Sequence, residues 1–97
     1  MIMHPYPSAR AAILDMSSKD RATRTRGADA ARLMLSAAPA ATPVWARPRP
    51  DSALGAYVRN VKITEVYTDG YVRVDLPVAL PGGRDYMIMH IEDITVL

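Results

Sequence analysis

Basic residues are concentrated in a short stretch near the N-terminus, among mainly small side chains. If residues 18–35 form a helix, Arg21, Arg24 and Arg32 lie on one face, with Arg26 beside them. Cationic groups in a row suit phosphate oxygens, and each such contact adds to the salt dependence of binding. The candidate nucleic-acid-binding residues are Lys19, Arg21, Arg24, Arg26 and Arg32. The alternative is an ordinary solvated helix face.

Trp45 is the only tryptophan, and it lies in a proline-rich stretch. A free tryptophan exposes a large apolar area, so we predict that Trp45 docks on another surface. Arg47 and Arg49 would then meet carboxylates of the C-terminal half, within one chain or between the two chains of a dimer. The candidate carboxylates are Glu65, Asp69 and Asp75.

A third candidate group consists of three tyrosines, Tyr57, Tyr67 and Tyr71. Tyr67 and Tyr71 flank a turn signal, which places them opposite one another on the outward face of a hairpin. Outward aromatic rings can stack bases or hold a proline-rich peptide. The alternative is a cross-strand pair that only stabilises the hairpin, by roughly 0.2–1 kcal/mol.

The apolar run near the C-terminus cannot face one core along its whole length. Either Met87 and Met89 or Tyr86 and Ile88 must look outward if the strand has one buried face. An outward methionine pair would form an adaptable protein-binding or dimer surface, whereas burial on both faces by the N-terminal helices is the alternative. The candidate partner-binding residues are Trp45, Arg47, Arg49, Tyr57, Tyr67, Tyr71, Met87 and Met89.

Composition argues against several classes of function. The chain has no cysteine, which excludes disulfides, cysteine zinc sites and thiol catalysis and fits a cytoplasmic location. His4 and His90 lie far apart, and no catalytic or nucleotide-binding motif is evident. No apolar run approaches the roughly 20 residues that cross a bilayer. We therefore predict a binding protein that is not an enzyme, with no cofactor, metal or membrane partner.

The net charge of +2 is unevenly distributed. Residues 1–50 carry eight basic and three acidic residues, which gives +5, whereas residues 51–97 carry four and seven, which gives −3. This asymmetry indicates either a basic arm for an anionic partner or two halves that attract each other.

The first half of the 97-residue chain divides into two segments. Residues 1–38 are predicted to form a basic helical arm, in which Ser8 caps a first short helix and Gly27 breaks or caps a second. Residues 39–54 are rich in proline, which predicts an extended, polyproline-like linker.

Residues 55–97 are predicted to form a small antiparallel β-domain. A three-residue loop ending at Gly70, with φ > 0, pairs Val66 with Val72. The preceding strand changes phase, so a bulge is expected near Thr64 or Glu65. A further strand, one 3₁₀ turn and a short final strand follow.

A strand, one tight turn and a short apolar terminal strand resemble the end of an SH3-like barrel. The resemblance covers residues 55–97 and implies a fold only. We therefore predict an α+β protein in which short N-terminal helices and a proline-rich linker pack on an SH3-like antiparallel β-barrel. Two functions remain open. In the first, the basic arm contacts nucleic acid or an acidic partner. In the second, the apolar β-surface binds protein. Such a protein could be a homodimer, or an inhibitor or assembly factor encoded by a phage or mobile element.

Overall fold

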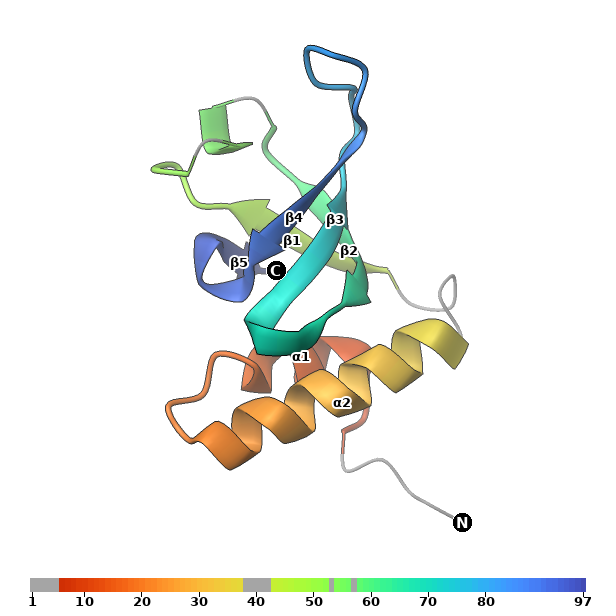
Figure 1. Cartoon of the computed structure of the whole chain (residues 1–97), viewed down its shortest axis with the longest axis vertical. Coiled ribbons are helices and arrows are strands. Elements are labelled where there is room, and N and C mark those ends of the chain that lie inside the picture. Colours follow the sequence, from red (N-terminus) through yellow and green to blue (C-terminus); the bar gives the residue numbers. More distant parts are fainter. Residues whose placement is uncertain (1–5, 38–42, 53, 57) are drawn as a thin grey trace.

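The structure is a computed structural model that describes residues 6–37, 43–52, 54–56 and 58–97. Two helices, α1 (Ala9–Asp15) and α2 (Arg21–Ala37), pack on each other at one end of a curled five-stranded antiparallel sheet (Figure 1). This arrangement confirms the predicted α+β class. No helix in the described part of the chain combines the length and apolar character needed to cross a membrane.

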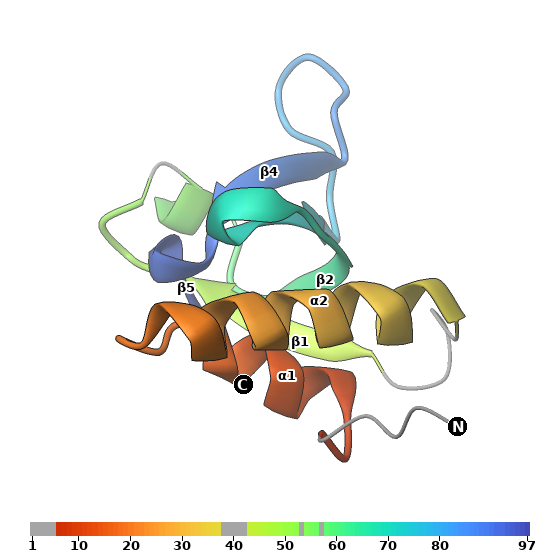
Figure 2. The same ribbon diagram turned by 60° about the horizontal axis from the view of Figure 1, so that its bottom comes forward.

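The sheet forms a half-barrel that is open toward the helices (Figure 2). Its strands are β1 (Val44–Pro48), β2 (Val61–Val66), β3 (Tyr71–Asp75), β4 (Tyr86–His90) and β5 (Ile94–Val96). Their order across the sheet is β4-β3-β2-β1-β5, so the first and last strands are neighbours. The short 3₁₀ helices are η1 (Leu54–Ala56), η2 (Thr68–Gly70) and η3 (Ile91–Asp93).

The hairpin between β2 and β3 has the predicted register. Val66 pairs with Val72, and the register shifts between Ile63 and Glu65, which places the bulge at Thr64. Gly70 has a φ of 83°, a conformation that glycine adopts at little cost. The bulge allows residues on both sides of it to face the core although their alternation is out of phase.

The prediction that Gly27 ends or breaks a helix was wrong, because α2 continues through it. A Cβ at this position would lie 2.5 Å from the carbonyl oxygen of Ala12 and 2.9 Å from the Cβ of Asp15. The missing side chain therefore lets α1 and α2 approach closely. At the start of α1 the prediction holds, since the Ser8 hydroxyl accepts a hydrogen bond from the Ala11 amide at 3.2 Å.

The linker prediction was wrong for residues 44–48, which form strand β1 inside the sheet. The first half of β1 pairs with β2 and the second half with β5, and Ala46 has partners on both sides. Pro48 stands at the end of the strand, where its missing N–H disrupts the ladder least. The sheet thus crosses the boundary drawn between linker and β-domain.

The core fills the space between the half-barrel and the helices. Its largest fully buried side chains are Ile13, Val44, Leu54, Val61, Ile63, Val72 and Val74. Burying one such side chain stabilises the fold by about 1.5–3 kcal/mol. Because this set includes residues of α1, β1, β2 and β3, helices and sheet share one core.

Candidate nucleic-acid interface

A cleft of about 740 Å³ lies between the N-terminal half of α2 and the turns η2 and η3. It is lined by Met16, Ser17, Ser18, Lys19, Arg21, Arg24, Thr25, Ala28, Asp29, Arg32, Thr68, Gly70, His90 and Glu92. The two walls are distant in sequence and meet because α2 packs on β2 and η2.

Four of the five predicted phosphate-binding residues line this one cleft, namely Lys19, Arg21, Arg24 and Arg32. The fifth, Arg26, is exposed but does not contribute to the lining. Two carboxylates, those of Asp29 and Glu92, share the cleft, so the lining has an excess of two positive charges when His90 is neutral.

Two of the cleft arginines also hold the structure together. The Arg24 Nη1 group donates to the carbonyl oxygens of Ser18 and Lys19, at 3.0 and 3.2 Å. The Arg32 Nε group donates to the carbonyl oxygen of Val66 at 3.2 Å. These contacts stabilise the loop before α2 and connect the helix to the end of β2.

Lys19 and Arg21 have no such structural role. Within the described residues, neither side chain makes a hydrogen bond or an ion pair, and both residues are exposed. Their charges are therefore available to an incoming anion without the loss of an existing contact. If these charges were already paired, breaking the pairs would cost free energy and weaken the binding of the anion.

The N-terminus of α2 is occupied by its own cap. An Asp20 carboxylate oxygen accepts hydrogen bonds from the hydroxyl and the amide of Thr23, at 2.6 and 3.0 Å. The hydrogen bond from the Thr23 side chain is the main reason that the pKa of Asp20 lies below its usual value. The positive potential of the cleft therefore comes from its side chains rather than from free amides of the helix end.

The opposite wall combines Gly70 with the ring of His90, which packs on Tyr71 just outside the cleft. The rings of Tyr71 and His90 pack edge to face, with centroids 5.1 Å apart and planes at 89°. The His90 Nδ1 atom accepts a hydrogen bond from the Glu92 amide at 3.2 Å, so in the neutral ring the Nε2 atom carries the proton. A Cβ on Gly70 would lie 2.8 Å from that Nε2 atom.

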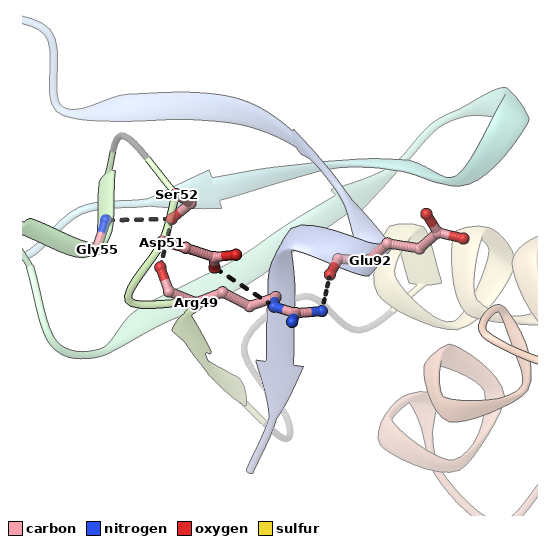
Figure 3. Close-up of polar contacts among 5 residues, drawn as sticks. All are labelled: Arg49, Asp51, Ser52, Gly55 and Glu92. Atoms are coloured by element: carbon pink, nitrogen blue, oxygen red, sulfur yellow. Dashed lines mark hydrogen bonds and ion pairs between the residues drawn. The ribbon is translucent and has the colours of Figure 1, made fainter.

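Arg49 fixes the far side of η3 (Figure 3). Its guanidinium lies 3.5 Å from the Asp51 carboxylate and donates to the Glu92 carbonyl oxygen at 3.4 Å. Its own carbonyl oxygen accepts from the Ser52 hydroxyl, which in turn accepts from the Gly55 amide. The loop after β1 is thereby connected to the turn that supplies Glu92 to the cleft.

Within one chain, the expected pairing of the two linker arginines was wrong for the carboxylates that the structure describes. Arg49 pairs with Asp51 instead of Glu65 or Asp75, and Arg47 is exposed on β1. The side chain of Asp69 lies outside the described part of the chain.

Trp45 does not dock within its own chain, since 49% of its surface is exposed. It borders a shallow hollow of about 510 Å³, which is lined by Arg10, Pro43, Trp45, Asn60 and Leu97.

Tyr67 and Tyr71 lie opposite one another across the turn, as predicted for the backbone, but their rings have different neighbours. Tyr71 packs on His90, whereas the Tyr67 hydroxyl donates to the Glu65 carboxylate, a hydrogen bond that raises the pKa of Tyr67. The backbone of Tyr67 does donate to the Tyr71 carbonyl oxygen, at 2.8 Å. Tyr57 lies outside the described residues.

The outward methionine pair was also wrong. Met89 is buried and Met87 packs against the core, so the exposed side chains of β4 are Tyr86 and Ile88. The period-two alternation of the strand left this choice open, and the pairing of β4 with β3 decides it. The sequence offered Tyr86 and Ile88 as the other outward pair, but it gave no sign that Arg73 and Arg84 lie beside the Tyr86 ring.

Among the described residues, no three histidine, aspartate or glutamate side chains gather closely enough to hold a metal ion. Comparisons with family models, with curated proteins and with solved structures give no match for this chain. The functional argument therefore depends on the cleft and on the surfaces next to it.

Proposed function

We propose that this protein binds nucleic acid without catalysing a reaction, and that the cleft between α2 and the η2 and η3 turns holds the phosphate backbone. The observation that carries the proposal is the gathering of Lys19, Arg21, Arg24 and Arg32 along one cleft. Lysine and arginine contacts to phosphate supply most of the sequence-independent affinity of such proteins.

The SH3-like character of the barrel is part of the same proposal. The strand order, with the last strand beside the first and a 3₁₀ turn between β4 and β5, supports it. In this arrangement the helices close the open end of the half-barrel, and the basic cleft forms where α2 meets the turns.

The test is a salt titration of binding to labelled DNA and RNA. With about three phosphates contacted, affinity should fall roughly 20- to 40-fold between 50 and 200 mM salt. The Lys19→Gln/Arg21→Gln variant should weaken binding and flatten the slope of log K against log salt by about 1.4–1.8. Within the described residues neither side chain makes a hydrogen bond or an ion pair, so the melting temperature should remain that of the unmodified protein.

The matched control is Arg47→Gln/Arg59→Gln, which removes the same charge from two exposed arginines that do not line the cleft. Its salt slope should stay close to that of the unmodified protein. Equal losses in both variants would show a general charge effect rather than a site. No retardation of any DNA or RNA at about 50 mM salt would overturn the proposal.

A second candidate function is protein binding, and the half-exposed Trp45 beside the Pro43 and Leu97 hollow favours it. Such a contact buries apolar area and resists salt. Trp45→Ala would then abolish a salt-resistant complex with a protein partner or a second copy, while leaving retention of nucleic acid unchanged.

A further inference from the structure

A row of exposed and half-buried side chains leads away from the cleft along the outward face of β3 and β4. Cross-strand pairing places Tyr71 beside His90, Arg73 beside Ile88, and Asp75 beside Tyr86. We call the members of this row other than Asp75 and the cleft residue His90, with the adjacent Arg84, the outer strip: Tyr71, Arg73, Arg84, Tyr86 and Ile88.

The outer strip is continuous with the basic cleft. Tyr71 follows Gly70 directly, and its ring packs on His90, while both Gly70 and His90 line the cleft. A chain whose backbone enters the cleft between α2 and η2 therefore meets Tyr71 next. The edge-on contact with His90 holds the Tyr71 ring on the sheet while 45% of its surface stays exposed.

Tyr86 provides a second ring at the far end of the strip. The Arg73 guanidinium lies 4.3 Å from its centroid and Nε lies 3.2 Å from the Asp75 carboxylate, so the ring rests against a fixed cation. Arg84 lies farther away, at 5.8 Å. Its guanidinium is exposed and can contact a phosphate next to a base stacked on Tyr86.

The spacing of the two rings suits separate nucleotides. Tyr86 pairs with Asp75, four residues along β3 from Tyr71, which corresponds to roughly 13–14 Å. This is about four times the 3.4 Å step between stacked neighbours in one strand of a duplex. The exposed Ile88 between the rings adds apolar surface for a sugar or a base.

Two carboxylates near the strip, those of Asp75 and Glu65, already accept side-chain hydrogen bonds, whereas Asp85, between Arg84 and Tyr86, is exposed. Asp75 accepts from Arg73 and from the Thr64 hydroxyl, and Glu65 accepts from the Tyr67 hydroxyl. Their charges are therefore partly compensated by neighbours rather than directed at the path of an incoming strand.

We propose that the ligand is single-stranded nucleic acid, with phosphates in the basic cleft and two non-adjacent bases of the strand stacked on Tyr71 and Tyr86. This proposal rests on the proposed function and adds the strand state and the stacking residues. The bases of a duplex are paired and stacked inside the helix, so their faces cannot reach either ring. Aromatic stacking accepts every base, and the site therefore binds single strands with little sequence preference.

The test compares a labelled oligothymidylate of about twelve nucleotides with a duplex of equal length, both at low salt. The unmodified protein should bind the single strand at least about tenfold more tightly. Tyr71→Ala or Tyr86→Ala should weaken that binding roughly 5- to 100-fold and leave duplex binding unchanged. Tyr71→Phe and Tyr86→Phe keep the ring and should retain the affinity.

Trp45→Ala is the matched control, because it removes an exposed ring of the same sheet from a strand outside the strip. It should bind oligothymidylate normally. If an alanine variant unfolds, Tyr71→Leu and Tyr86→Leu keep apolar bulk without an aromatic face and should show the same loss. Leucine variants that bind normally would contradict stacking.

The outcomes separate this inference from the proposed function. Salt-sensitive binding that prefers duplex, or that ignores both tyrosines, would overturn the single-strand proposal and leave the cleft proposal intact. Failure to bind either ligand at low salt would overturn both.

Discussion

Gly70 carries two constraints at once, one from its backbone and one from its neighbour. Its φ of 83° lies in the left-handed region, and a Cβ would lie 2.8 Å from the His90 Nε2 atom. Gly83 has a similar φ, 87°, but a Cβ there would have no neighbour within 4 Å. The two glycines therefore separate backbone strain from side-chain contact.

We expect Gly83→Ala to destabilise the protein by about 1–2 kcal/mol through backbone strain alone. Gly70→Ala should cost more, by about a further 1 kcal/mol, because the imidazole must move and loses its bond from the Glu92 amide. Urea unfolding measures both. In a His90→Ala background, Gly70→Ala should cost no more than Gly83→Ala, because no imidazole is left to displace, and equal losses for the two single glycine variants would show that the imidazole yields freely.

At the scale of elements, the contact between α1 and α2 depends on Gly27. Alanine in a helix interior is normally favoured over glycine by about 1 kcal/mol. Here the added methyl group would meet the Ala12 carbonyl oxygen, at 2.5 Å, and backbone cannot move aside as a flexible side chain can. Packing and helix propensity therefore act in opposite directions.

We expect packing to dominate, so that Gly27→Ala lowers the free energy of unfolding by about 1–3 kcal/mol. Ser36→Ala, at an exposed position of the same helix, should raise it by up to about 0.5 kcal/mol. Thermal melts of the two variants provide the measurement. Stabilisation by Gly27→Ala would mean that the two helices are not held at this distance in solution.

Local signals predicted the elements that depend on local chemistry. The Ser8 cap, the loop ending at Gly70 and the bulge at Thr64 each follow from residues within a few positions of one another. Strand β1 was missed because its prolines indicated a polyproline course, although buried Val44 and Ala46 alternate with exposed Trp45 and Arg47. Only pairing with the distant β2 and β5 distinguishes the two extended conformations.

In the candidate site too, one part could be predicted from local sequence and another part depends on the tertiary fold. Helical spacing of the arginines predicted one wall of the cleft from sequence. The other wall, with Gly70, His90 and Glu92, comes from turns that reach α2 only through the tertiary fold. The outward choice of Tyr86 over Met87 likewise depends on the pairing of β4 with β3.

At the scale of the whole molecule, β1 joins the helical half to the barrel. It lies between β2 and β5, and β5 has no other strand neighbour in the described sheet. Arg10 donates to the carbonyl oxygen of Leu97, and Arg32 to that of Val66, so the helices also bond to the sheet. The basic half and the acidic half therefore fold as parts of one sheet-and-helix unit.

A fragment of residues 55–97 should consequently fail to fold. It lacks β1, so β5 loses its partner strand and Val61 to Ile63 lose theirs. With 43 residues and no cysteine, it is also near the size below which a chain usually needs disulfides or metals.

A fragment of residues 43–97 restores all five strands and should be partly ordered, but it leaves uncovered the core face on which Ile13 and Leu35 pack. Dispersion of backbone amide NMR signals, with urea unfolding of each fragment, provides the measurement. Cooperative unfolding of the 55–97 fragment would show that the sheet forms without β1. That result would contradict the place of β1 between β2 and β5, where both neighbours depend on it for pairing.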